Sequence, residues 1–510
     1  MARPYRYNPP TIDSSTYTPN RQRDGPSDEY GDLEILPAMM SEKRPTPTLM
    51  ERSIRPFERF VHIESSGGIL LLGCSLLALA WANSPGAGAF VHFWETPVGV
   101  AAGSRGLSMP LKDWINDGLM ALFFFLIGLE VKREFLVGEL AAPRHAVLPI
   151  AAALGGMAVP ALIYAWFNGG TPAEPGWGIP MATDIAFAIG ILSMLGKRVP
   201  MSLKVFLTAL AIVDDLGAVV VIAIFYTEAI NWGGVFPALV ILVVLMELNR
   251  QGVRHPLPYG VLGIGLWLAV LASGIHATVA GVVLAMTIPS RARIDSDQFL
   301  AQSRATVDEF ARAGHSRADQ FITEAHQAAL HSLKTATIHV QTPMERFEHG
   351  LHPWITFVIM PLFALANAGV GITTDVGAML VDPVVLGVFF GLVLGKQAGI
   401  MLFAWLAIRS GLATLPPDLR WVQLYGAAWL GGIGFTMSLF IAELAFPHSP
   451  ELVPAKLGIL AASLVAGLVG AAIVRAASPA PGPDAGSMVD DGRSPKRETS
   501  ADRTPERRNR

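Results

Sequence analysis

Two adjacent aspartates, Asp214 and Asp215, interrupt an apolar run that extends from Val205 to Tyr226. A helix rises about 1.5 Å per residue, so this run would span about 33 Å, close to the thickness of a bilayer's hydrocarbon core. An ionised carboxylate at the centre of a membrane helix costs about 2.5–3.5 kcal/mol on insertion scales, and acids at this depth usually serve a function. The pair therefore predicts an ion or proton pathway, and the structural alternative is that each carboxylate is neutralised by a structural partner.

A third acid lies in the preceding apolar stretch, where Thr183 and Asp184 follow Gly178 and Pro180. Glycine and proline at the start of a short span favour a helix that is broken inside the membrane. A break leaves partial positive charge at half-helix N-termini and frees backbone carbonyl oxygens. Asp184 would then neutralise the positive ends and Thr183 would offer a hydroxyl. The structural alternative is an acid near the external mouth without a partner.

Lys396 lies deep in another apolar stretch, Val384–Ile408, where its amine cannot easily extend to the membrane surface. A buried lysine is stable only when it is paired or deprotonated. We expect its partner to be a midplane aspartate or the negative end of a broken helix, and the alternative is a bystander near a helix end. The glycine-interrupted stretch from Gly431 to Leu444 predicts a second broken span.

Two groups of charges lie where apolar stretches end. The first contains Glu130 and Glu134, and the second contains Glu348 and His349. Interfacial charges commonly do no more than mark the ends of helices. The alternative is a charged funnel whose Glu and His side chains titrate near neutral pH and control access to the site. His276, in contrast, is expected to be an ordinary interfacial histidine.

The elements that would position these residues are membrane helices. The chain has 510 residues, of which 52% are hydrophobic and only 15% charged, a composition typical of polytopic membrane proteins. Runs of about 20 apolar residues predict about twelve spans. Their centres lie near residues 75, 124, 156, 188, 215, 240, 264, 282, 361, 395, 433 and 465.

Lys and Arg residues are distributed unequally between the two sets of loops that these spans define. One set carries most of them, and the other carries only Arg105, Lys112 and Lys456. Because cytoplasmic loops of membrane proteins are rich in Lys and Arg, the rich side and both termini are predicted to be cytoplasmic. Cys74 is the only cysteine, which excludes an intrachain disulfide or a cysteine metal cluster.

Five segments follow from this pattern. The membrane domain comprises residues 59–289, with the first eight spans, and residues 346–476, with the last four. Residues 1–58 and 477–510 have the polar, Pro-rich composition of disordered tails, and the second tail is basic. Residues 290–345 are predicted to form amphipathic helices in a cytoplasmic loop, because apolar side chains recur there at helical spacing. We expect no cofactor and no nucleic-acid partner.

Several segments resemble the signature sequences of NhaA-type bacterial sodium/proton antiporters. They are ATDIAFAIG, LAIVDDLGAVVVIAIFYT, GLEVKRE, SGIHATVAG, LHPWITFVIMPLFALANAG, LGKQAGI and GGIGFTMSLFIAELAF. The resemblance covers roughly Arg59 to Arg475, and the two tails and the long loop from Ser290 to Gln341 depart from it. It implies an all-α polytopic membrane fold of about twelve helices in the bacterial cytoplasmic (inner) membrane. Inverted repeats and two broken, crossing helices are expected, an architecture of which this family is a known example.

The same resemblance implies roles for the charged residues. Asp214 and Asp215 would carry the exchanged ions, with Asp215 as the direct ligand of Na⁺ or Li⁺, and Lys396 would pair with Asp214. Thr183 and Asp184 would lie where the broken helices cross. The pH-responsive cytoplasmic funnel would consist of Glu130, Glu134, Glu348 and His349. The implied activity is electrogenic extrusion of Na⁺ in exchange for external H⁺, activated at alkaline pH, and a homodimer is one possible assembly.

Two other functions use similar residues. A sodium-coupled symporter of an organic solute would share the broken helices and midplane charges but would need a separate solute pocket. An intramembrane aspartyl protease would need its two aspartates on separate helices, whereas Asp214 and Asp215 are adjacent and the chain has no GxGD-type motif. Transport in a lipid bilayer, without enzymatic activity, is therefore the expected function.

Overall fold

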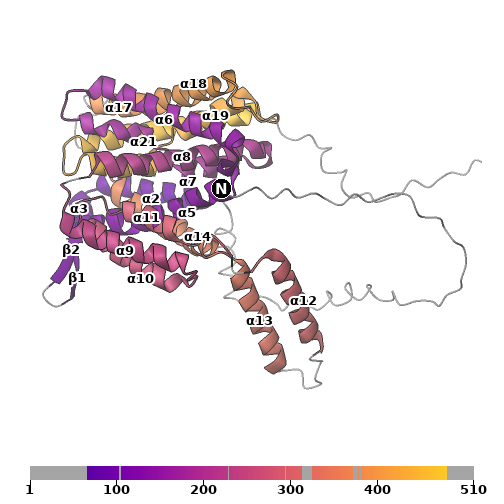
Figure 1. Ribbon diagram of the computed structural model, residues 1–510. Coiled ribbons are helices and arrows are strands. Elements are labelled where there is room, and N and C mark those ends of the chain that lie inside the picture. Colours follow the sequence, from indigo (N-terminus) through magenta and orange to yellow (C-terminus); the bar gives the residue numbers. More distant parts are fainter. Residues whose placement is uncertain are drawn as a thin grey trace, which may run out of the picture. The chain divides into compact units, whose positions relative to one another are not determined.

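The computed structural model describes residues 66–478 except 103–104, 228, 293, 313–323, 372–376, 378 and 380. The predictions for the two tails concern segments that lie almost entirely outside these residues. Within the described part, the regular structure is helical apart from one short hairpin, and the long helices lie side by side (Figure 1). The predicted all-α membrane fold is confirmed, with the hairpin as an addition.

The helices fall before and after the 290–345 loop. Before the loop they are α2 (Ser66–Ala82), α3 (Ala87–Glu95), α4 (Leu111–Asp113), α5 (Met120–Leu136), α6 (Pro143–Asn168), α7 (Ile185–Met194), α8 (Met201–Phe225), α9 (Trp232–Arg250), α10 (Pro256–Leu271) and α11 (Val279–Thr287). From the loop onward they are α12 (Ser296–Arg312), α13 (Glu324–Val340), α14 (Pro343–Trp354), α15 (Met360–Asn367), α17 (Pro383–Phe390), α18 (Lys396–Arg409), α19 (Trp421–Gly431), α20 (Phe435–Ala445) and α21 (Leu452–Ala477).

Short π-helical or 3-10 segments join some of these helices into single spans. The π-helical turns are Trp114–Leu119 between α4 and α5, Ile355–Ile359 between α14 and α15, and Gly391–Gly395 between α17 and α18. A 3-10 helix, Glu174–Met181, precedes α7. Turns of this kind inside membrane helices frequently mark functional sites.

In the described part of the chain, nine helical segments are long and apolar enough to cross a membrane, or eleven if each bent helix pair counts as one span. Of the twelve predicted centres, eleven lie in helices and the one near residue 433 lies in the break between α19 and α20. The centre near residue 282 lies in α11, which has only 9 residues. The predicted polytopic organisation is thus confirmed.

Both predicted broken spans are present. In the first, extended backbone at residues 182–184 separates the 3-10 helix Glu174–Met181 from α7. In the second, α19 ends at Gly431 and α20 begins at Phe435, with a bend of 41° between them. Because these breaks expose backbone polar groups at membrane depth, they are tolerated only where protein surrounds them.

Helices α6 and α18 pack along each other, and their backbones approach closely. A Cβ atom at Gly155 would collide with the Gly399 backbone, and a Cβ atom at Gly399 would collide with the Gly155 backbone. Small residues at such a contact allow membrane helices to pack closely. This contact holds the helix that carries Lys396 against the rest of the bundle.

A β-hairpin that the sequence did not predict follows α3. Its strands, β1 (Pro97–Ala102) and β2 (Arg105–Pro110), pair in antiparallel register from Pro97 opposite Pro110 to Ala102 opposite Arg105. Helix α3 itself bends away from α2 by 115°. The 290–345 segment contains α12 and α13, which pack against each other.

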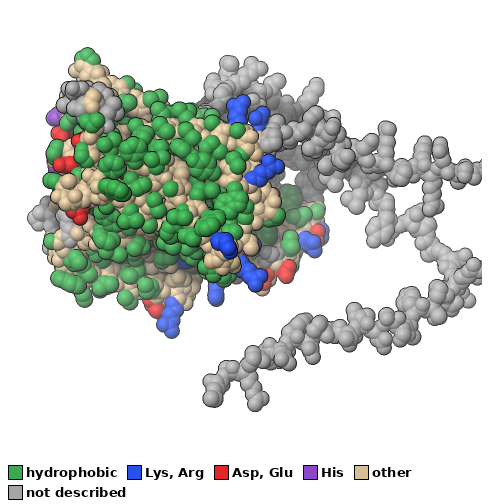
Figure 2. Space-filling view, turned by 90° about the horizontal axis from the view of Figure 1, so that it is seen from above, with side chains coloured by type: hydrophobic (Ala, Val, Ile, Leu, Met, Phe, Trp, Pro, Cys, Tyr) green, Lys and Arg blue, Asp and Glu red, His purple; other side chains and the backbone are tan. Residues whose placement is uncertain are grey.

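The outer surface of the bundle is apolar over a wide area. Figure 2 shows a broad hydrophobic face with most Lys and Arg side chains along one edge and His side chains at the opposite edge, while Asp and Glu side chains lie at both. Large apolar side chains are exposed on several helices; Trp166 is 89% exposed and Ile224 is 65% exposed. A surface of this kind matches a protein whose solvent is lipid.

The buried apolar residues form two clusters. The larger, which we call the crossed-helix core, surrounds the two broken spans and contains Leu207, Leu392 and Phe440. The smaller, which we call the α10 cluster, joins α5, α9, α10, α11 and α14 and contains Leu245, Tyr259 and Leu266. All the predicted midplane charges lie within the first of these regions.

Candidate ion-binding site

The two broken spans cross at Asp184. Its backbone N–H donates to the Ile433 carbonyl at 2.6 Å, in the break of the second span. Its carboxylate caps α7 by accepting from the Phe187 N–H at 3.1 Å. The other carboxylate oxygen accepts from the Thr436 N–H at 3.0 Å and from the Thr436 hydroxyl at 2.5 Å, at the start of α20. One buried carboxylate therefore neutralises the positive ends of both half-helices.

Two hydroxyls strengthen the crossing. Thr183 donates from its Oγ1 to the Gly431 carbonyl at 2.8 Å, at the end of α19. Ser438 donates from α20 to the Ile179 carbonyl at 2.8 Å, in the 3-10 helix before α7. Each bond satisfies a carbonyl oxygen that a continuous helix would have used internally.

Asp214 and Lys396 form a fully buried ion pair. The Lys396 Nζ lies 2.7 Å from Asp214 Oδ2, and the side chains of both residues are 0% exposed. The same amine also donates to the Met181 carbonyl, directly before the break in the first span. Its position in an apolar stretch predicted either an aspartate or the negative end of a broken helix as partner, and Lys396 contacts one of each: Asp214 and a freed carbonyl oxygen.

Asp215 has a different environment from its neighbour. It is 1% exposed, and among the described residues neither of its carboxylate oxygens has a hydrogen-bond partner. Gln397, next to Lys396, is 3% exposed and likewise has an amide oxygen and nitrogen without hydrogen-bond partners in the described part of the chain. Buried polar atoms without partners are costly, so the Asp215 carboxylate is a candidate for binding an ion or a proton.

The chemistry of the site suits a hard monovalent cation or a proton. Its polar groups are carboxylate, hydroxyl and carbonyl oxygens, the donor atoms that hard cations prefer. Among the described residues, no group of three His, Cys, Asp or Glu side chains could hold a metal ion. A cation here would have to take ligands from Asp214, Asp215 and neutral oxygens nearby.

The predicted funnel residues are brought together only in part. Arg133, on α5, forms an ion pair with Glu348 on α14, and its other terminal nitrogen lies 3.5 Å from Glu134. Glu130 lies one turn before Glu134 on α5. His349 is exposed, and its one polar contact in the described residues is Nδ1 to the Glu345 carbonyl of its own helix, at 2.7 Å.

A cavity of about 400 Å³ adjoins this cluster and is lined by Glu134, His145, Lys204 and Thr208 among others. Thr208 lies on α8, six positions before Asp214, which corresponds to about 9 Å along a helix. The cavity therefore approaches the buried site from the end of α8 that carries Lys204.

Two further charged groups were not predicted as sites. Glu443, on α20, forms ion pairs with Lys112 at 2.7 Å and with Lys456 at 2.6 Å, and so ties the α4–α5 span and α21 to the second broken span. His276 Nε2 lies 3.4 Å from Asp117 Oδ1. A charge in an apolar run predicts that the residue is buried. Its partner depends on which distant helices come into contact, and the sequence alone does not show that.

Crossed broken helices around buried charges, in a bundle with an apolar exterior, define a secondary ion transporter. The profile of the "Na+/H+ antiporter 1" family matches residues 58–474. The chain therefore belongs to the Na⁺/H⁺ antiporter 1 family. Members of this family are multi-pass bacterial membrane proteins that act as transporters and not as enzymes.

Relatives called "Na(+)/H(+) antiporter NhaA" are similar over most of their length. The protein of Oleidesulfovibrio alaskensis is 50% identical over 84% of this chain and 95% of its own. The protein of Koribacter versatilis is 49% identical over 83% of this chain and 92% of its own. That of Acidithiobacillus ferrooxidans is 50% identical over 82% of this chain and 96% of its own. The family resemblance inferred from the motifs is confirmed.

Proposed function

We propose that this protein exchanges Na⁺ for H⁺ across the membrane at the site formed by Asp214 and Asp215. The observation that carries the proposal is the contrast between these neighbours: Asp214 is paired with Lys396, whereas both carboxylate oxygens of the buried Asp215 are without hydrogen-bond partners in the described part of the chain. The names of the relatives and the family match support the same activity.

Competition for one acidic site explains the exchange. When the carboxylates are protonated, Na⁺ meets no anionic ligand; when the protons leave, two carboxylates and nearby neutral oxygens form a hard oxygen site. We infer that Asp215 is the direct cation ligand and that Asp214 carries a proton in alternation with its pairing to Lys396. Movement of the crossed spans would then expose the site to each side in turn.

Thr183 and Asp184 have a positioning role in this scheme. Their hydrogen bonds to Gly431 and Thr436 hold the two breaks together, next to the carbonyl of Met181 that Lys396 contacts. Because half-helix ends are fixed by these bonds, a small shift of one span would move the other with it.

The cytoplasmic route is inferred from the cavity beside Glu134. We propose that Glu130, Glu134 and Glu348, with Arg133 between the last two, form a charged entrance that responds to pH, and that His349 lies at its rim. Because cytoplasmic loops are rich in Lys and Arg, we expect this end and both termini to be cytoplasmic, in the bacterial inner membrane.

Charge movement would drive the exchange. If more protons than Na⁺ ions move in each cycle, the membrane potential contributes about 2.3 kcal/mol per charge per 100 mV to Na⁺ extrusion. Li⁺, which is also a hard cation, is expected to replace Na⁺. We also expect a homodimer in the lipid bilayer, as a prediction from the family resemblance alone.

The test is Na⁺ flux in proteoliposomes driven by a pH gradient. Wild type should exchange, and Asp215→Asn should lower the rate by at least about 100-fold, because an amide offers the cation no charge and the loss of one charged partner of a bound ion costs about 2–5 kcal/mol. Full exchange in both Asp214→Asn and Asp215→Asn would disprove the assignment. Na⁺ uptake that requires an organic solute would favour the symporter instead.

The pH dependence gives an independent check. Protonated carboxylates have no charge to offer Na⁺, so the rate at about pH 6 should be well below the rate at about pH 8.5. Equal rates at both values would rule out competition between Na⁺ and H⁺ for one site.

A further inference from the structure

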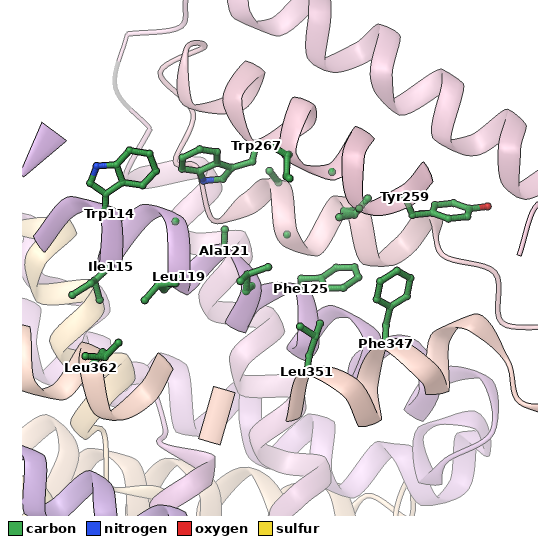
Figure 3. Close-up of a pocket in the computed structure, with 18 of the residues that line it drawn as sticks. Trp114, Ile115, Leu119, Ala121, Phe125, Tyr259, Trp267, Phe347, Leu351 and Leu362 are labelled. Atoms are coloured by element: carbon green, nitrogen blue, oxygen red, sulfur yellow. The ribbon is translucent and has the colours of Figure 1, made fainter. Parts of the chain in front are cut away.

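A cavity of about 630 Å³ lies in the α10 cluster, apart from the ion site. Figure 3 shows Trp114 and Trp267 at one end and Tyr259 and Phe347 at the other, with Phe125 between them. Its walls come from α5, α10, α11 and α14, together with the segment around Trp94. The volume lies within the range of about 300–1,000 Å³ that is usual for small-molecule sites.

The walls of this cavity are almost entirely carbon. Four aromatic side chains that line it carry hydrogen-bond donors, and three of these donors are already used at 2.9 Å: Trp114 to the Val98 carbonyl, Trp267 to the Asp117 carbonyl and Tyr259 to the Val253 carbonyl. Water needs two to four polar partners in a buried site, and these walls do not provide them. An apolar occupant fits the cavity and water does not.

Two exposed side chains in the cavity wall indicate an opening towards the bilayer. Leu122 on α5 and Ile264 on α10 line it, and they are 42% and 64% exposed. Both residues belong to membrane-spanning helices, so the medium outside them is lipid hydrocarbon. From Tyr259 to Trp267 the wall extends about 12 Å along α10, at about 1.5 Å per residue. The cavity is therefore long enough to hold an extended hydrocarbon chain that enters from the bilayer.

One polar group at the cavity remains without a partner. Trp94 lines it and is 4% exposed, and its Nε1 has no hydrogen-bond partner among the described residues. The nearby Leu111 N–H donates to the Thr96 carbonyl at 3.0 Å, which places Trp94 at the Leu111 and Trp114 end. Tryptophan side chains commonly lie at the level of lipid headgroups, with the indole N–H directed to a polar acceptor.

We propose that this cavity binds one acyl chain of a membrane glycerolipid, and that the indole of Trp94, whose Nε1 is enclosed by protein, turns to donate a hydrogen bond to the ester carbonyl of that lipid. The apolar walls and the lateral opening favour an acyl chain of a lipid. The unpaired indole N–H favours an acceptor such as the ester carbonyl, which lies where the hydrocarbon of a glycerolipid ends. This inference does not rest on the ion-exchange function.

Gly260 provides a variant that fills the cavity without strain. It lines the cavity, and a Cβ atom there would meet nothing within 4 Å, so Gly260→Leu places a side chain in the space that the lipid would use. Gly73, on α2, is the matched control: it is also helical, exposed and free of neighbours at its Cβ, and it lies outside the cavity.

The experiment uses the full chain in vesicles of phosphatidylethanolamine and phosphatidylglycerol that contain a phosphatidylethanolamine with a photoreactive diazirine in one acyl chain. After illumination, labelled peptides are identified by mass spectrometry. We expect strong labelling of the α10 segment around Gly260–Trp267 in wild type and in Gly73→Leu, and its loss in Gly260→Leu. Retained Na⁺ exchange shows that each variant is folded.

A second variant tests the ester contact. Trp94→Phe keeps an aromatic ring, although a smaller one, and removes the donor. Wild type should therefore be labelled more strongly by the ester-linked probe than by its ether-linked analogue, and Trp94→Phe should be labelled equally by both. The proposal is overturned if α10 is labelled no more than the lipid-facing α9, or if Gly260→Leu does not change the labelling. Cross-links from α10 to a second copy of the chain or to residues 1–65, in place of lipid, would also overturn it.

Discussion

The crossed-helix core and the α10 cluster bury side chains in opposite ways. The most apolar window of α8, which carries Asp214 and Asp215, is 61% buried, whereas the corresponding window of α9 is only 11% buried. The core encloses Asp184, Asp214, Asp215 and Lys396, and the described residues of α9, α10 and α11 include no buried charge. Charges are thus kept where surrounding protein can pair them, and lipid contact is left to the apolar helices.

The difference also appears in what holds each region together. Side-chain to backbone hydrogen bonds join distant segments of the core, such as Thr183 to Gly431 and Ser438 to Ile179. The α10 cluster depends on apolar and aromatic contacts, such as Phe125 against Phe347 with ring centroids 5.5 Å apart. We therefore expect substitutions in the core to affect stability and transport together, and substitutions in the α10 cluster to affect stability alone.

The largest effect is expected for Lys396→Ala. It leaves Asp214 buried without its cation, and breaking a buried pair in this way costs about 3–5 kcal/mol of unfolding free energy. The double variant Lys396→Met with Asp214→Asn removes both charges and should recover most of that loss while Na⁺ exchange stays absent. Unfolding in detergent micelles measures the stabilities. A Lys396→Ala variant as stable as wild type would contradict the buried pair.

A smaller effect is expected for loss of a helix cap, and each region offers one. Asp184→Ala removes the acceptor at the start of both α7 and α20, and at about 0.5–2 kcal/mol per cap it should lower both stability and exchange. Asn231→Ala removes the single cap of α9, where its side chain accepts from the Gly233 N–H at 3.0 Å. It should cost about 1 kcal/mol and leave exchange unchanged. Equal losses of exchange in the two variants would remove the distinction between the regions.

The smallest effect is expected for Tyr259→Phe in the α10 cluster. It removes one hydrogen bond, to the Val253 carbonyl at 2.9 Å, which corresponds to about 0.5–1.5 kcal/mol of stability. Exchange measured in proteoliposomes should stay at the wild-type rate. A large loss of exchange in a stable Tyr259→Phe variant would mean that this region takes part in transport.

Some residues of the ion site could be predicted from the sequence and others could not, for physical reasons. Asp214, Asp215 and Lys396 stand out because a charge within an apolar run is expensive and therefore rare. Thr436 and Ser438 are ordinary in a membrane helix, and only the crossing of two distant breaks turns them into partners of Asp184 and Ile179. The breaks themselves were predictable from glycine and proline.

The short hairpin and the ion pairs of Glu443 were not predictable in the same way. The strands, PVGVAA and RGLSMP, contain Pro, Gly and Ala residues that are depleted in strands, and the pairing of each depends on the other strand. Glu443 meets Lys112 and Lys456 from two other elements, 331 positions away along the chain in the case of Lys112. Tertiary contacts of this kind cannot be read from local composition.

The most direct test of the central claim measures protons that Na⁺ displaces from the purified protein. Na⁺ is added at alkaline pH in weakly buffered detergent solution, and the released protons are counted with a pH indicator dye. Competition at Asp214 and Asp215 predicts proton release from wild type that saturates with Na⁺ and is absent in Asp215→Asn. Saturable Na⁺ binding without proton release, or equal release from Asp215→Asn, would contradict a shared site for the two ions.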